Sequence, residues 1–297
     1  MLEWFAAARL IVVLASGPAG ARSLRVEPAS VAVGGLAVVR TETSPAGGTF
    51  DGQRLRFFAA DGESVALIGI DLGHPPGRYP IEVEGRDGSR LRATIEVVPR
   101  QFPEERLTVP RSYVEPDRAA LARIERERRL LAALWDKTAA EPYWHGPFLP
   151  PADGPAGSAF GLRRFFNGEP RSPHAGIDFR APQGAPVHAS NRGRVVLAQD
   201  LFFTGNTLVV DHGCGLFTVY VHLSDLGVRR GAWVERGQEI GKVGMTGRAT
   251  GPHLHFAVRV GDARIDPAAL LSRDLGAARA NRSGDGPDGL VISGGES

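Results

Sequence analysis

The segment FTVYVHL, residues 217–223, alternates between two kinds of side chain and therefore predicts a β-strand. Residues two apart in a strand share a face, which puts His222 on the face opposite four apolar residues. A second segment, HLHFAV at residues 253–258, places His253 and His255 on one face in the same way. Such alternation is typical of antiparallel sheets with one buried face, so the chain is expected to be mainly β.

A third segment, PHAGIDF at residues 173–179, follows the same pattern. His174 and Asp178 share one face, while Ile177 and Phe179 point to the other. A single histidine on a strand face is structural in most proteins. Four histidines and an aspartate on three such faces instead predict a site that binds metal and moves protons.

These motifs resemble those of the lysostaphin- and LytM-like zinc metallopeptidases over about residues 159–272. The resemblance rests on separated motifs in the same order, namely His174-x-x-x-Asp178, Tyr220-Val221-His222-Leu223 and His253-Leu254-His255. Supporting phrases are Gly176-Ile177-Asp178-Phe179, Asp211-His212-Gly213, Gly237-Gln238-Glu239-Ile240-Gly241 and Gly244-Met245-Thr246-Gly247.

The resemblance implies a role for each of the five residues. His174, Asp178 and His255 would bind a Zn²⁺ ion and leave its fourth position open for water, as in catalytic zinc sites. His222 and His253 would form a second pair close to the metal. One of them would act as general base, and the other would stabilise the tetrahedral intermediate or protonate the leaving amine; either assignment fits. The implied activity is hydrolysis of amide bonds in the cross-link peptides of peptidoglycan.

Composition excludes several other classes of protein. The 297 residues carry a net charge of +2 and contain no block of basic residues interleaved with aromatic ones, so no nucleic-acid partner is expected. Cys214 is the single cysteine, which rules out an intrachain disulfide and a cysteine-based zinc site.

The chain divides into five expected parts. Residues 1–23 resemble a signal peptide, which implies export to the periplasm or cell envelope. Residues 24–100 predict an Ig-like β-sandwich with short strands, and residues 101–158 predict a helical linker. Residues 159–272 form the peptidase domain, an antiparallel sheet with a substrate groove, and residues 273–297 a disordered tail. No segment of the mature chain is long and apolar enough for a membrane span.

Several strands and one helix can be placed more closely. Strands are expected at 36–41, 55–58, 65–70, 79–84 and 91–98. Residues 116–139 predict an amphipathic helix with Leu121, Ile124, Leu131 and Leu134 on its apolar face, and residues 141–158, rich in proline and glycine, predict a linker.

Four further residues near these motifs are expected to be structural. His188 is interpreted as a structural residue, His212 as a loop residue that could line the groove, and Cys214 as an incidental thiol. Some latent family members block zinc with an upstream asparagine, but Asn167 is interpreted here as part of the groove wall.

Two alternatives to the implied enzymatic activity are considered. A peptidoglycan-binding activator of other wall hydrolases, either non-hydrolytic or autoinhibited, is the alternative, and a regulatory protein partner stays open. The glycine-rich hairpins between residues 234 and 247 also suggest a lipoyl or biotinyl carrier. Lys242, however, lies within a predicted strand and not at a hairpin tip, and a carrier has no use for the His and Asp residues.

Overall fold

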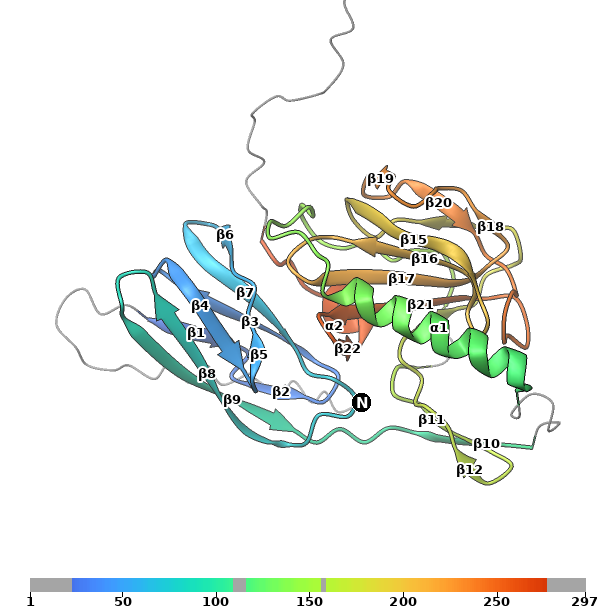
Figure 1. The fold of residues 1–297 in the computed structure, drawn as a ribbon, viewed down its shortest axis with the longest axis horizontal. Helices are drawn as coiled ribbons and strands as arrows, with labels where there is room; N and C mark the ends of the chain where they lie inside the picture. The colour runs from blue at the N-terminus through green and yellow to red at the C-terminus, as the bar shows by residue number, and fades with distance from the viewer. Residues whose placement is uncertain (1–22, 109–115, 156–158, 277–297) are drawn as a thin grey trace, which may run out of the picture.

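The computed structural model describes residues 23–108, 116–155 and 159–276 (Figure 1). β-Strands, mainly in antiparallel sheets, are the predominant regular structure of these residues, which confirms the mainly β fold class. The expected signal peptide and most of the expected C-terminal tail lie outside the described residues. No helix of the described part is long and apolar enough to cross a membrane.

The N-terminal part consists of two sheets that enclose a buried apolar cluster. One sheet has the order β1 (Leu24–Glu27), β3 (Leu36–Thr41), β7 (Glu63–Gly69) and β6 (Phe58–Ala60). The other has the order β2 (Ser30–Ala32), β9 (Arg90–Val98), β8 (Gly77–Gly85), β4 (Pro45–Phe50) and β5 (Gln53–Arg54). Four of the five expected strands match these bounds closely; the fifth, expected at 55–58, begins at Phe58.

Two tight hairpins in this part follow from Asp-Gly pairs. Asp61 and Gly62 connect β6 to β7 with φ of 52° and 83°, and Asp51 and Gly52 connect β4 to β5 with φ of 46° and 73°. Two consecutive positive φ angles are the signature of the type I′ turn, whose twist matches that of the flanking strands. The short aspartate side chain and glycine tolerate this backbone better than other residues.

Strands β3 and β7, in the middle of the sheet β1-β3-β7-β6, are buried on both faces. In β3, Ala37 and Val39 point into the sandwich, while Leu36 and Val38 join the apolar core of the C-terminal part. The residues that β7 contributes to these two cores alternate in the same way. Strands covered on both faces read as continuous apolar runs and not as alternating ones, which explains the sequences LAVV and VALI.

The C-terminal part is built on a seven-stranded antiparallel sheet. Its order is β13 (Ile177–Phe179), β21 (Leu254–Val260), β17 (Leu216–Leu223), β16 (Gly205–Asp211), β15 (Gly193–Leu201) and β19 (Trp233–Val234), with β22 (Ala263–Ile265) paired to β21. A smaller sheet contains β14 (Pro186–His188), β20 (Glu239–Lys242) and β18 (Asp225–Leu226). A short helix, α2 (Pro267–Leu271), follows β22.

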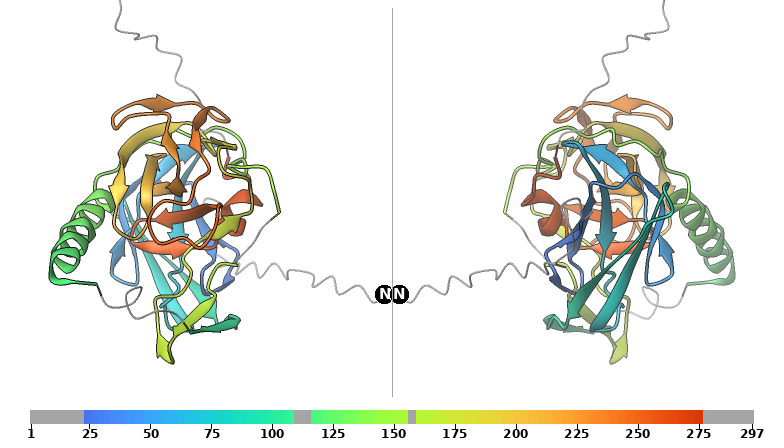
Figure 2. Two further views of the ribbon diagram at one scale, coloured as in Figure 1. Left: turned by 90° about the vertical axis from the view of Figure 1, so that its right-hand side faces the viewer. Right: turned by 90° about the vertical axis from the view of Figure 1, so that its left-hand side faces the viewer.

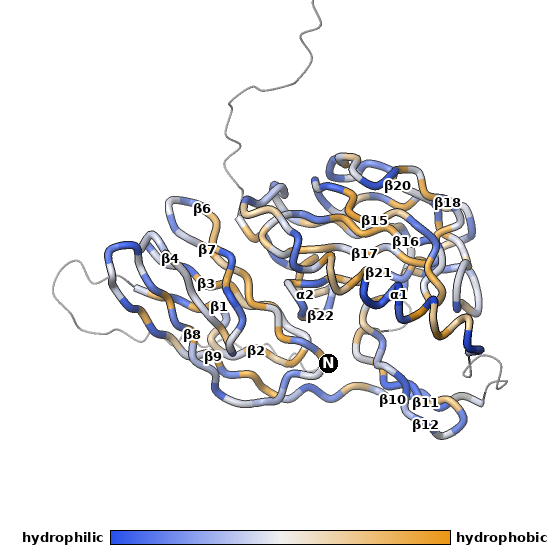
Figure 3. The backbone as a smooth tube through the Cα atoms, in the orientation of Figure 1, coloured by the Kyte–Doolittle hydropathy of each residue, from blue (hydrophilic) through white to orange (hydrophobic). Residues whose placement is uncertain are grey.

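A second small sheet lies apart from these layers. It contains β10 (Glu104–Leu107), β11 (Arg163–Phe166) and β12 (Glu169–Pro170), with β10 parallel to β11. Figure 2 shows it projecting from the rest of the molecule, and Figure 3 shows that it is largely hydrophilic. Asn167 and Gly168, with φ of 52° and 86°, form the turn between β11 and β12, so Asn167 lies at the exposed tip of this hairpin.

The expected linker region packs onto the C-terminal sheet along much of its length. Helix α1 (Arg118–Trp135) is capped by Asp117, whose side chain accepts a hydrogen bond from the Ala120 amide at 2.7 Å. Leu134 and Trp135 pack into a cluster with Phe217 and neighbouring apolar residues of the sheet. Leu121, expected on the apolar face, is 54% exposed instead.

The segment after α1 is also tightly packed, although its proline and glycine content predicts a linker. Trp144 is 1% exposed and lies against Phe58 of β6 with 5.2 Å between ring centroids. The Asn191 side chain bonds to the backbone of this segment at residues 145–147. This segment is therefore an ordered connection that packs between the N-terminal and C-terminal parts.

Candidate active site

Strands β13, β21 and β17 align the central residues of the site. In the register of the sheet Asp178 lies opposite His255, and His255 lies opposite Val221. His174 lies in the loop before β13, where its backbone amide bonds to the Leu162 carbonyl at 3.0 Å. The expectation that His174 sits on a strand is therefore wrong, although its side chain does reach Asp178.

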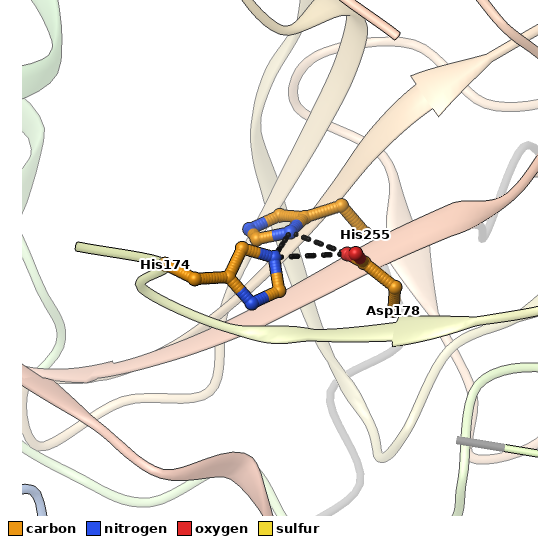
Figure 4. Close-up of side chains that lie close together, drawn as sticks. All are labelled: His174, Asp178 and His255. Atoms are coloured by element: carbon orange, nitrogen blue, oxygen red, sulfur yellow. Dashed lines mark hydrogen bonds and ion pairs between the residues drawn. The ribbon is translucent and has the colours of Figure 1, made fainter. Parts of the chain in front are cut away.

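Three potential ligand atoms converge at this point (Figure 4). His174 Nε2 lies 3.0 Å from Asp178 Oδ1 and 2.8 Å from His255 Nδ1, and the last two atoms are 2.9 Å apart. Burial raises the pKa of Asp178, but hydrogen bonds and charge from the two histidines outweigh it and hold that pKa well below its usual range. Asp178 is therefore a carboxylate at neutral pH.

The donor set fits a divalent cation of the zinc type. Two imidazole nitrogens and one carboxylate oxygen are ligands that zinc accepts, and three protein ligands are typical of catalytic sites. The opposite ring nitrogen of His174, Nδ1, lies 3.0 Å from the Ala159 carbonyl. Donation to that carbonyl fixes the tautomer and turns the Nε2 lone pair toward the other two ligands.

His222 and His253 lie together beside this cluster. Their ring centroids are 4.8 Å apart, and His253 Nε2 is 4.0 Å from Asp178 Oδ1. The Nδ1 atoms of both rings lie 2.8 Å from backbone carbonyls, those of Thr246 and Gly251 respectively. With Nδ1–H donating to a carbonyl, each ring has Nε2 free to accept or to give up a proton. Burial lowers the pKa of His222 to about 4, so this imidazole is neutral at neutral pH.

His222 reaches the site through an irregularity in β17. Strict alternation would place it on the Tyr220 face, whereas its neighbour Val221 is paired with His255 and shares the His255 face. His222 has φ of 65°, and the pairing register to β16 shifts at this point by one extra residue. Tyr220 and Leu223 consequently both enter the main core. Such a bulge re-aims a side chain next to a functional site.

Two glycines of the motifs permit close approaches within the site. A Cβ on Gly176 would collide with the Phe256 carbonyl and would lie 2.8 Å from His255 Nε2. A Cβ on Gly244 would lie 2.7 Å from the His222 carbonyl and would collide with the Ser224 amide. The sequence motif contains both glycines, but their packing role becomes visible only in three dimensions.

The remaining histidines lie outside the site. His188 is in β14 and donates its backbone amide to Pro151, consistent with a structural role. His212 lies in the loop between β16 and β17, as expected, but it is 0% exposed and therefore does not line the groove. Its Nε2 lies 2.8 Å from Thr218 Oγ1, which in turn bonds to the Tyr220 hydroxyl. Burial lowers the pKa of His212 to about 4.

Cys214 is a buried free thiol at a left-handed backbone position, with φ of 53°. Its Sγ lies 3.0 Å from the Ala140 carbonyl, and burial raises the pKa of the thiol well above its usual range. A thiol held in the protonated form is a poor nucleophile, which agrees with an incidental role.

A buried His-Asp-His cluster with a second histidine pair beside it is the arrangement of a metal-dependent hydrolase. The profile of peptidase family M23 matches residues 172–267, which include all five site residues. A protein from Pseudomonas aeruginosa assigned to peptidase M23 has a crystal structure that is similar with a TM-score of 0.62 and 32% identity, covering 81% of this chain and 94% of that one. This chain belongs to peptidase family M23.

Curated relatives match over the C-terminal part. The chain is 45% identical over 108 residues to the peptidoglycan DD-endopeptidase ShyB of Vibrio cholerae, which is 36% of this chain and 25% of the relative. It is 41% identical over 97 residues to the DD-carboxypeptidase/endopeptidase Mpg of Neisseria gonorrhoeae, which is 33% of this chain and 22% of the relative. The chain thus spans about a quarter of the length of these curated relatives.

Proposed function

We propose that this chain is an exported, zinc-dependent endopeptidase that hydrolyses amide bonds in the cross-link peptides of peptidoglycan. The observation that carries the proposal is the convergence of His174 Nε2, Asp178 Oδ1 and His255 Nδ1 within 3.0 Å of one another. The names of the curated relatives support the substrate, and the expected signal peptide at residues 1–23 supports action in the periplasm or cell envelope.

In this proposal His174, Asp178 and His255 hold the Zn²⁺ ion. When bound, the ion lowers the pKa of a water molecule and polarises the scissile carbonyl. Asp178 contributes the negative charge of the ligand set because its carboxyl group stays ionised.

His222 and His253 move the protons. Each would present Nε2 toward the reacting groups while its Nδ1–H is held by a backbone carbonyl. One ring accepts the proton of the attacking water at Nε2. The other enters the step protonated on both nitrogens and donates its Nε2–H to the leaving amine or in a hydrogen bond to the developing oxyanion. Backbone anchoring of both rings limits the reorganisation needed during the reaction.

The alternative function is a non-hydrolytic or autoinhibited activator that binds peptidoglycan, and its non-hydrolytic form is disfavoured by the site. A non-hydrolytic role is expected when a ligand or a proton-transfer residue is lost, and all five residues are present in this chain.

The test compares purified residues 24–297 with two single variants. The wild-type protein is expected to contain about one zinc per chain and to release soluble fragments from purified peptidoglycan. His255→Ala should lose zinc and activity, whereas His253→Ala should keep zinc and lose activity. A wild-type protein that binds no zinc after reconstitution would contradict the proposal, and bound zinc without cleavage would favour the activator.

A further inference from the structure

The middle of α1 contacts the turn between β15 and β16. Glu127 Oε2 accepts a hydrogen bond from the Phe202 amide at 2.9 Å, and Glu127 Oε1 accepts one from Arg123 Nε at 2.6 Å. Arg123 also donates to Asp200 Oδ2 at 2.8 Å. Arg123 and Glu127 lie one turn apart on the helix face that meets the sheet, and the Glu127 side chain is 15% exposed.

The same turn holds the backbone of His222. The His222 amide donates to the Thr204 carbonyl at 2.9 Å, two residues beyond the amide that Glu127 binds. The Phe203 carbonyl between them accepts a hydrogen bond from the Arg248 amide at 2.8 Å. Three consecutive residues of the turn therefore bond to α1, to the loop after residue 245 and to His222.

Thr246 connects the same turn to the imidazole ring of His222. Its carbonyl lies 2.8 Å from His222 Nδ1, and its hydroxyl accepts from the Asn206 amide at 2.9 Å and donates to the Leu223 carbonyl at 2.9 Å. A Cβ on Gly205 would collide with Thr246, so the β15–β16 turn and this loop are in direct contact. A shift of the turn would therefore reach both the backbone and the ring of His222.

His222 needs this support because its backbone is strained. A non-glycine residue with φ of 65° persists only where surrounding contacts over-determine it. The regular ladder between β17 and β21 ends one residue earlier, at Val221 paired with His255. At His222, hydrogen bonds to Thr204 and Thr246 take the place of the strand pairing with β21.

We propose that Glu127 is a positioning residue for the proton-transfer residue His222. By fixing the Phe202 amide, it holds the β15–β16 turn in the place that His222 requires. This inference rests on the proposed function of His222, and it gives α1, which precedes the matched peptidase region, a part in catalysis. Glu127 itself touches neither substrate nor metal.

The test uses three variants of the full chain. Glu127→Ala removes the acceptor for the Phe202 amide, whereas Glu127→Gln keeps an acceptor oxygen. Glu125→Ala is the matched control, because Glu125 lies on the same helix but pairs with Arg128 at the surface and is 47% exposed. Each variant is assayed for kcat and KM on a soluble cross-linked peptide, for zinc content, and for the imidazole ¹⁵N signals of His222.

Glu127→Ala is expected to lower kcat by roughly 10- to 100-fold, as a small misplacement of a reacting group does, with KM and zinc content near wild type. Glu127→Gln should recover most of the loss, and Glu125→Ala should behave like wild type. A wild-type kcat in Glu127→Ala would overturn the proposal, as would loss of zinc from it or an equal loss of activity in Glu125→Ala.

The NMR measurement separates this proposal from the proposed function. If the wild-type protein cleaves no peptide, the proposed function fails, but the His222 signals can still be compared. A changed His222 Nδ1 signal in Glu127→Ala and an unchanged one in Glu125→Ala support the positioning role. Unchanged signals in both variants refute it.

Discussion

The Nε2 atom of His174 lies 2.8 Å from the Nδ1 atom of His255. Two ring nitrogens at this distance cannot both direct lone pairs at each other without a proton or a cation between them. The Asp178 carboxylate oxygen lies within 3.0 Å of both, so the favoured occupant is positively charged. Stability of this region should consequently depend on that charge.

Removal of the metal should lower the melting temperature of the wild-type protein. A ligand that binds only the folded chain stabilises it by about 4 kcal/mol at a thousandfold excess over Kd. Thermal unfolding with and without a chelator measures this effect. His174→Ala should melt at one temperature in both conditions, whereas the exposed control His145→Ala should respond like wild type. Equal chelator shifts in all three proteins would contradict the assignment.

Gly176→Ala should weaken metal binding without changing any ligand. The new Cβ would press on the imidazole of His255 and on the Phe256 carbonyl, so His255 must shift. Loss of ligand alignment typically costs roughly 10- to 100-fold in metal affinity, which competition with a chromogenic chelator measures. Gly47→Ala is the control, because nothing lies within 4 Å of the position that its Cβ would take. Unchanged affinity in Gly176→Ala would show that the sheet absorbs the added methyl group.

His212 should make stability fall as the pH drops below neutrality. Its folded pKa of about 4 lies below the ordinary value of 6.5, so the unfolded chain binds a proton first. The stabilisation from the neutral imidazole is present above about pH 6.5 and is lost as the pH falls toward 4. Between pH 7 and pH 5 the free energy of unfolding should fall by about 2 kcal/mol more in wild type than in His212→Asn, as measured with urea. Parallel pH profiles would mean that folding leaves the pKa of His212 unchanged.

Asp71 and Arg264 should couple the N-terminal sandwich to β22. Arg264 donates to the Asp71 carboxylate from its backbone amide, from Nε and from a terminal guanidinium nitrogen, at 2.7–2.9 Å. The pair is partly exposed, so a double-mutant cycle with Asp71→Ala and Arg264→Ala should give a coupling of about 1 kcal/mol.

The same pair has a pH signature of its own. Burial raises the pKa of Asp71, but the hydrogen bonds and charge of Arg264 outweigh it and lower that pKa to about 2. The coupling should be complete above about pH 4 and should disappear as the pH falls through 2. A coupling that is unaffected at pH 2 would contradict this view of the pair.

Much of the site could be predicted because its chemistry lies in residue types. His, Asp and glycine at fixed spacing are readable without coordinates, and the five residues do lie together. The reason offered for His222, strand alternation, was nevertheless wrong. Strict alternation would place its ring on the face of the sheet that carries Tyr220. The ring instead reaches the site because His222 has a left-handed backbone and β17 contains an extra residue at this point. A sequence pattern cannot show such a break, because it depends on hydrogen bonds from distant segments.

The relation between the N-terminal and C-terminal parts was less predictable. The apolar run of β3 contained a signal for burial on both faces, but a short apolar run fits several environments. The role of α1 was hidden for another reason. Arg123 and Glu127 look like ordinary surface charges in sequence, and their contacts to residues 200–202 bridge more than seventy positions of the chain.

The burial of strands β3 and β7 on both faces has a mechanical consequence. A domain on a flexible linker can turn relative to the rest of its chain, but here one face of a sandwich sheet is part of the apolar core of the C-terminal domain. A partner that binds the outer sheet β2-β9-β8-β4-β5 would therefore lie at a fixed distance and orientation relative to the His-Asp-His cluster. In the proposed endopeptidase, the orientation of the site relative to the sandwich is therefore set by the fold.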